Sequence, residues 1–108
     1  MIVKESTLDQ TLIALADPTR RAILRRLLEG EARVTEIAAP FDISLNSVSK
    51  HIRILERANL VKRQKQGREH ILSIAPAPLD EAAEWIDAQR SLWSARLSEL
   101  DMLLDKKA

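Results

Sequence analysis

Hydrophobic and polar residues alternate at helical spacing from the start of the chain. Leu8, Leu12 and Leu15 follow one another at intervals of four and three residues. This spacing puts the three side chains on one face and predicts a short amphipathic helix over residues 5–16. The apolar face of such a helix needs a partner elsewhere in the protein.

A second helix is predicted directly after the first. The Asp17 carboxylate can cap its first turn, and Pro18 fits the first helical position, where its missing N–H costs no hydrogen bond. Gly30 suits a left-handed C-terminal cap. The apolar residues between these ends are Ala22, Ile23, Leu24, Leu27 and Leu28.

Residues 34–58 have the pattern of two helices joined by a tight turn. The first helix is predicted over Val34–Phe41 and is kept short by Pro40. The second begins after Ser44, a favoured N-cap, and ends before Asn59, which suits a left-handed cap. Its inward stripe consists of Val48, Ile52 and Leu55.

Two short strands joined by a glycine-containing loop follow, and they predict a β-hairpin over residues 60–74. The strands are expected at Leu60–Gln64 and Glu69–Ile74, with Lys65–Arg68 as the loop. Residues 75–78 read Ala-Pro-Ala-Pro. We expect them to form a stiff connector that is not helical through its middle.

The longest pattern of the chain predicts a helix from Leu79 to about Leu104. Its apolar positions repeat at intervals of three and four over almost four heptads, interrupted once by Arg90, which indicates packing against another helix. We therefore expect residues 1–16 and 79–105 to form a homodimer interface. The residues predicted to lie in this interface are Leu8, Leu12, Ile86, Trp93, Leu97, Leu100 and Leu104.

Composition places these elements in one domain of mainly α class with a small β-hairpin. The chain has 108 residues, of which 45% are hydrophobic but only 3% aromatic, so its core must be aliphatic. No apolar run approaches the roughly 18 residues of a membrane span. The N-terminal residues are too few and too charged for a signal peptide, and no cysteine is present. We expect a cytoplasmic protein with no membrane partner.

Charge is unevenly distributed, although the net charge is only +1. Residues 44–70 hold seven Lys or Arg against two Glu, a local charge of +5, whereas residues 79–108 have a local charge of −3. A basic middle segment indicates that a polyanion binds there. The alternative is a solvated charged surface, which is the usual explanation of a charge cluster.

The outer face of the helix after Ser44 has the groups that DNA recognition requires. Small, hydrogen-bonding side chains in its first turns can approach base edges in the major groove. The expected base contacts are Asn46, Ser47 and Lys50. The residues expected mainly to hold phosphates are Ser44, His51, Arg53, Lys65 and Arg68. The competing interpretation is an ordinary surface helix beside a solvated hairpin, which the preceding short helix and tight turn disfavour.

Catalytic and metal-binding patterns are missing from the sequence. It has no Gly-rich phosphate loop and no recognisable nucleophile–base pair, so we do not expect an enzyme. His51 and His70 are the only histidines, and no cysteine could complete a metal site with them, so no metal or cofactor is expected. Trp85 and Trp93 are expected to pack against other residues, with a ligand pocket as the alternative.

Four segments together resemble the ArsR family of winged helix–turn–helix transcriptional regulators. They are Ala16-Asp17-Pro18-Thr19-Arg20-Arg21-Ala22-Ile23-Leu24, Ser44 through Leu55, Ala58-Asn59-Leu60-Val61 and Gly67-Arg68. The resemblance implies a symmetric dimer, joined by the first and last helices, that represses promoters by occupying operator DNA.

Many members of that family are released from DNA by metals. Their ligands are a cysteine pair on the third helix, or Asp and His groups on the last helix. This chain has Glu36-Ile37-Ala38-Ala39 at the first place and no His at the second. It instead resembles a metal-independent branch whose last helix is rich in Trp and Arg.

We therefore expect a dimeric repressor that binds double-stranded DNA at a palindromic operator without a metal site. Two alternatives stay open. One is a sensor of a metal or small molecule with an unrecognised site, and the other is a winged helix that binds protein instead of DNA.

Overall fold

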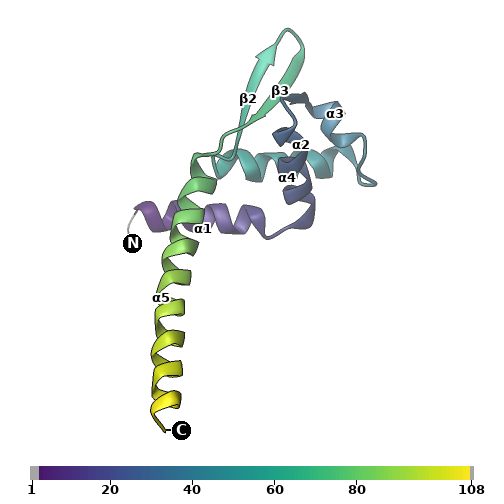
Figure 1. The fold of residues 1–108 in the computed structure, drawn as a ribbon. Helices are drawn as coiled ribbons and strands as arrows, with labels where there is room; N and C mark the ends of the chain where they lie inside the picture. The colour runs from purple at the N-terminus through teal and green to yellow at the C-terminus, as the bar shows by residue number, and fades with distance from the viewer. Residues whose placement is uncertain (1–2, 108) are drawn as a thin grey trace.

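A computed structural model describes residues 3–107 of the chain. Five helices and three short strands are arranged as a compact body from which the last helix projects (Figure 1). In chain order the elements are α1 (Val3–Leu15), α2 (Pro18–Leu28), β1 (Ala32–Arg33), α3 (Val34–Ala38), α4 (Leu45–Arg57), β2 (Val61–Gln66), β3 (Glu69–Ile74) and α5 (Ala77–Lys107). This order confirms the predicted fold class.

The predicted helix caps are confirmed at three places. The Asp17 side chain accepts a hydrogen bond from the backbone N–H of Arg20 at the start of α2. The Ser44 side chain accepts one from the N–H of Ser47 at the start of α4. Asn59 follows α4 with a φ of +60°, the left-handed conformation that Asn tolerates better than most residues.

An aliphatic core lies between α2, α3, α4 and the sheet. The three residues of the predicted α4 stripe, Val48, Ile52 and Leu55, are completely buried. They pack among Ile23 and Leu27 of α2, Ile37 of α3, and Leu60 and Leu72 from the hairpin region. Burying one such side chain stabilises the fold by roughly 1.5–3 kcal/mol. The stripe therefore fixes which face of α4 is turned outward.

The sheet has one strand more than the sequence pattern predicted. β1 pairs antiparallel with β3 on the side opposite β2, with Ala32 beside Leu72 and Arg33 beside Ile71. A strand of two residues has no detectable alternation, so the pattern could not reveal it.

The predicted hairpin loop, Lys65–Arg68, was too long. β2 continues to Gln66, which pairs with Glu69, so only Gly67 and Arg68 form the turn. Gly67 has a φ of +64°, which a glycine adopts without steric cost and which tight hairpin turns require. Lys65 consequently lies in β2 opposite His70 and not at the tip.

Two predicted helix boundaries were also wrong. α3 ends at Ala38 and not at Phe41, because a helix does not usually continue up to a proline such as Pro40. α5 begins at Ala77, inside the expected connector. Pro78 is tolerated there because the first turn of a helix has no internal partner for its backbone N–H groups.

α1 and α5 pack against each other, and they differ in how they contact the rest of the protein. α1 buries Thr11 and Ala14, whereas the predicted Leu12 remains 38% exposed. α5 crosses α1 near its own N-terminal end and then extends well beyond the rest of the molecule (Figure 1). Residues 1–2 of the predicted dimerisation segment 1–16 lie outside the described residues. Within residues 3–107, no helix is long and apolar enough to cross a membrane.

Candidate nucleic-acid interface

The outer face of α4 is held in a fixed orientation by the stripe beneath it. Asn46, Lys50 and Arg53 are exposed on this face, as the helical pattern predicted. Within the described part of the chain, Lys50 and Arg53 form no ion pair, so their positive charge is available to an external anion. The face combines an amide, small hydroxyls and cations, which suits contacts to base edges and phosphates.

Two serines at the start of α4 are bonded to each other. The Ser44 hydroxyl oxygen accepts from the Ser47 N–H at 3.1 Å and lies 3.0 Å from the Ser47 hydroxyl oxygen. This arrangement caps the helix and orients both hydroxyls before any ligand arrives. Ser47 is half-buried, whereas Ser44 is exposed.

His51 has partners at the start of α2, Arg20 and the N-cap Asp17, that the sequence pattern did not predict. Its Nδ1 lies 3.2 Å from Nη1 of Arg20 and 3.8 Å from Oδ2 of Asp17. The backbone hydrogen bond from Arg20 lowers the pKa of Asp17; desolvation opposes this effect, and the charge of a protonated His51 adds to it. The side chain of His51 is 23% exposed, so part of the ring can still reach a phosphate. Its phosphate contact stays a prediction.

One of the cations in the hairpin is already neutralised. The Arg63 guanidinium on β2 donates two hydrogen bonds to the Glu56 carboxylate on α4, at 3.2 and 2.7 Å. Lys65 and Arg68 are exposed and form no ion pair with the residues that the structure describes. The two predicted phosphate contacts of the hairpin are therefore free cations, while Arg63 fixes the hairpin to α4.

An open groove of about 390 Å³ separates α4 from the hairpin. It brings Ser49 of α4 together with Arg68 of the turn, so the helix and the hairpin face a common space. The sequence pattern did not indicate several of its lining residues, because they come from five different elements and the hairpin turn. The lining residues are Arg33, Val34, Thr35, Leu45, Ser49, Arg63, Arg68, Glu69 and His70. Arg33 and Glu69 form an ion pair of 2.8 Å at its edge.

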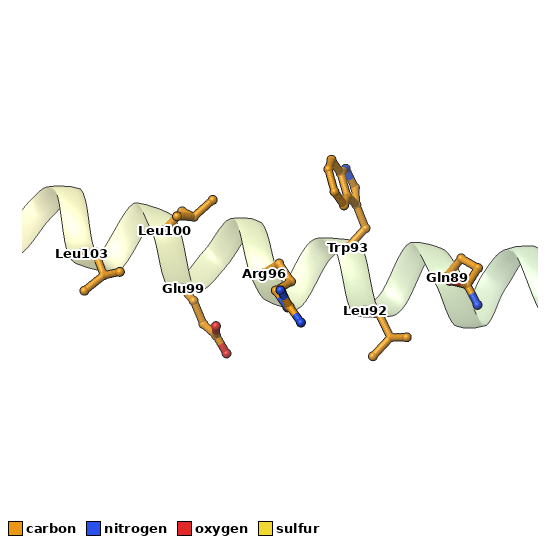
Figure 2. Close-up of a pocket in the computed structure, with 7 residues that line it drawn as sticks. All are labelled: Gln89, Leu92, Trp93, Arg96, Glu99, Leu100 and Leu103. Atoms are coloured by element: carbon orange, nitrogen blue, oxygen red, sulfur yellow. The ribbon is translucent and has the colours of Figure 1, made fainter.

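A second surface runs along α5. Five apolar residues that the seven-residue pattern placed on one stripe are exposed, and we call them the α5 seam: Ile86, Trp93, Leu97, Leu100 and Leu104. Trp93 is 67% exposed and Leu104 66%. Trp93 and Leu100 of the seam also line a hollow of about 540 Å³, whose seven lining residues all come from α5 (Figure 2). A hollow with walls from one helix is open on its other side, unlike an enclosed ligand pocket.

Metal ligands do not converge on either surface. Among the described residues, no group of three or more His, Asp or Glu side chains is placed to hold a metal ion. The two histidines lie on α4 and β3, and His70 lines the groove.

Comparisons with known proteins match most of the chain. Residues 15–64 match a family model described as a helix–turn–helix domain. The chain is 35% identical to the HTH-type transcriptional regulator Rv2034 of Mycobacterium tuberculosis, over 92% of this chain and 90% of that protein. It is 34% identical to the transcriptional repressor SdpR of Bacillus subtilis, over 68% of this chain and 81% of that protein.

Comparisons with solved structures identify the same class of protein. A crystal structure of the ArsR family transcriptional regulator RHA00566 superposes with a TM-score of 0.80 at 41% identity, covering 87% of this chain and 97% of that one. The homodimeric winged helix–turn–helix DNA-binding domain Mb0332 of Mycobacterium bovis superposes with a TM-score of 0.64 at 26% identity, covering 81% and 82%.

A helix–turn–helix whose second helix is exposed beside a β-hairpin defines a winged helix–turn–helix DNA-binding protein. α3, α4 and the β2–β3 hairpin have this arrangement. The chain belongs to the ArsR family of transcriptional regulators, on the identity and coverage of its relatives.

Proposed function

We propose that this regulator is a homodimer that represses transcription by occupying an imperfectly palindromic operator. The observation that carries the proposal is the α5 seam, an apolar stripe left exposed on a helix that extends beyond its own domain. Contiguous exposed apolar surface on a small protein marks an interaction site. A second copy of the chain would cover it, since a stripe with heptad spacing packs against a matching helix.

α1 also has exposed apolar residues. Leu12 and Ile13 are exposed on the helix that packs against α5, while Leu8 is half-buried. Among the relatives, Mb0332 is named as a homodimeric winged helix–turn–helix domain, and SdpR is named as a repressor. Both names support the proposal for this chain.

A two-fold dimer would present two copies of α4 to the same side of DNA. Two recognition helices in successive major grooves require half-sites about 34 Å apart, roughly one helical turn of DNA. In each half-site, Asn46, Ser47 and Lys50 would contact bases. The residues proposed to hold phosphates are Ser44, His51, Arg53, Lys65 and Arg68.

The proposal also includes regulation without a metal at the two sites known in the family. Glu36, Ile37, Ala38 and Ala39 occupy the place of the cysteine pair on α3, and α5 has neither His nor Cys. Adding Zn²⁺ or Ni²⁺ to the purified protein should leave its melting temperature and its DNA affinity unchanged. A metal-dependent rise in melting temperature would favour the sensor alternative.

Two experiments test the dimer and its DNA together. Sedimentation should give twice the chain mass, a dimer, for the wild type and for Ser98→Asp. It should give the mass of one chain, a monomer, for Leu97→Asp. Ser98→Asp adds the same charge one residue further on, away from the α5 seam. Selection of bound duplexes from random DNA should give two inverted half-sites. A monomeric wild type, or a single asymmetric site, would contradict the proposal.

A further inference from the structure

Arg20 connects three elements through one guanidinium group. Its Nε donates to the carbonyl of Ala14 at 2.8 Å, and Nη2 donates to the carbonyl of Ile13 at 3.0 Å. These two carbonyls lie in the last turn of α1, and that of Ile13 also accepts a hydrogen bond from the N–H of Ala16 at 3.2 Å. Its Nη1 lies 3.2 Å from Nδ1 of His51 on α4. Arg20, itself in α2, thus joins the end of α1 to the proposed recognition helix.

The contact determines which nitrogen of His51 carries the proton. A guanidinium only donates hydrogen bonds, so Nδ1 must act as the acceptor. The neutral ring therefore has its proton on Nε2. The Asp17 carboxylate faces the same Nδ1 at 3.8 Å, beyond hydrogen-bond distance, and its Oδ2 already accepts from the N–H of Arg20 at 3.1 Å. Within residues 3–107, no group accepts a hydrogen bond from Nε2 of His51.

We infer that Arg20 is a positioning residue for DNA binding, which rests on the proposed function. It fixes His51 as the Nε2–H tautomer, so that the ring offers an N–H donor to a DNA phosphate. It also fixes α4 relative to α1, the helix that packs against α5. The orientation of each recognition helix relative to the dimer interface then depends on this one side chain.

Four variants separate positioning from simple stabilisation. Arg20→Lys keeps the charge but lacks the planar fork of donors with which the guanidinium reaches α1 and His51 together. His51→Asn places an oxygen near the position of Nδ1 and can keep the Arg20 contact, but it has no donor at the position of Nε2. His51→Gln can place an N–H donor near the position of Nε2, but it has no acceptor at the position of Nδ1 for the Arg20 contact. Arg21→Lys is the matched control, because the Arg21 side chain donates to the carbonyl of Leu15 at 2.7 Å and forms no hydrogen bond or ion pair with α4 within residues 3–107.

The probe for binding is the duplex that the wild type selects from random DNA. We expect Arg20→Lys, His51→Asn and His51→Gln each to weaken its binding about tenfold, the loss expected for one hydrogen bond to a charged group. Arg21→Lys should bind like the wild type. Adding Arg20→Lys to His51→Gln should cause little further loss, because the contact is already absent.

A spectroscopic measurement tests the tautomer without DNA. The ¹⁵N chemical shifts of His51 in the free wild-type dimer should show a protonated Nε2 and an unprotonated Nδ1. In Arg20→Lys the ring should populate both tautomers, whereas in Arg21→Lys it should not change. His51→Asn keeps the inference testable if Arg20→Lys lowers the melting temperature too far to fold.

Different outcomes contradict different claims. An Nδ1–H tautomer in the wild type, or equal losses of affinity in Arg20→Lys and Arg21→Lys, would overturn this inference and leave the proposed function intact. A wild type that selects no duplex would overturn the proposed function and the role of Arg20 in DNA binding with it.

Discussion

Arg63 of β2 and Glu56 of α4 form a two-pronged ion pair, with hydrogen bonds of 3.2 and 2.7 Å. The pair fixes the angle between the hairpin and the proposed recognition helix. It also cancels one of the positive charges that the sequence places in this region. The positive charge available to a ligand at the groove is therefore smaller than a count of Lys and Arg indicates.

The first prediction concerns the double variant Glu56→Gln with Arg63→Gln. It leaves the net charge unchanged and removes the pair, so unfolding free energy should fall by at most about 1 kcal/mol, because both side chains are partly exposed. The salt dependence of DNA affinity should stay at the wild-type slope. Lys65→Gln, two residues along the same face of β2, should do the opposite. It should lower the slope by about 0.9 and leave the stability unchanged.

The second prediction separates base contacts from phosphate contacts. Lys50→Ala should weaken binding of the selected duplex by about 1–3 kcal/mol and weaken random DNA much less, because it removes a base contact. Arg68→Ala should weaken both duplexes alike and lower the salt slope by about 1. Titrations at several salt concentrations measure both quantities, and each variant is the control for the other. If neither variant changed affinity or slope, the proposed binding surface would be wrong.

The helix caps and the buried face of α4 could be predicted from the sequence, because each depends on the local effect of one residue type. The caps at Asp17, Ser44 and Asn59 and the buried stripe of α4 follow from side-chain chemistry within a few residues, and the structure confirms all four. Strand β3 was predicted with its correct bounds, Glu69–Ile74.

Three features that the sequence pattern missed have a common physical origin in contacts between distant segments. β1 exists because Ala32 and Arg33 pair with β3, and nothing in those two residues alone requires a strand. The contact of His51 with Arg20 joins positions 31 residues apart, so helical periodicity could place His51 on a face but could not supply its partner. The groove between α4 and the hairpin was missed for the same reason.

The third prediction tests the cap of the proposed recognition helix. Ser44→Ala removes the hydroxyl that binds the Ser47 N–H, and it should lower the free energy of unfolding by about 1 kcal/mol. Urea denaturation measures this loss. Ser49→Ala, in the same helix but without a capping role, should change it by no more than about 0.5 kcal/mol. Equal effects of the two variants would mean that the cap contributes nothing specific.

The last prediction uses the acid dependence of stability. The hydrogen bond from the Arg20 N–H lowers the pKa of Asp17 in the folded protein below its usual value of 3.8. For a carboxyl group with a lowered folded pKa, the stabilisation is present above the unfolded pKa and is lost as the pH falls through the folded value.

Asp17→Asn should therefore have a lower melting temperature than the wild type near neutral pH, because the amide oxygen accepts the N–H bond more weakly than a carboxylate. The difference should shrink below about pH 4 and vanish once the wild-type carboxyl is protonated in both states. Melting curves of both proteins from about pH 7 to pH 2 measure it. A difference that stays constant over this range would show that the charge of Asp17 has no part in stabilising α2.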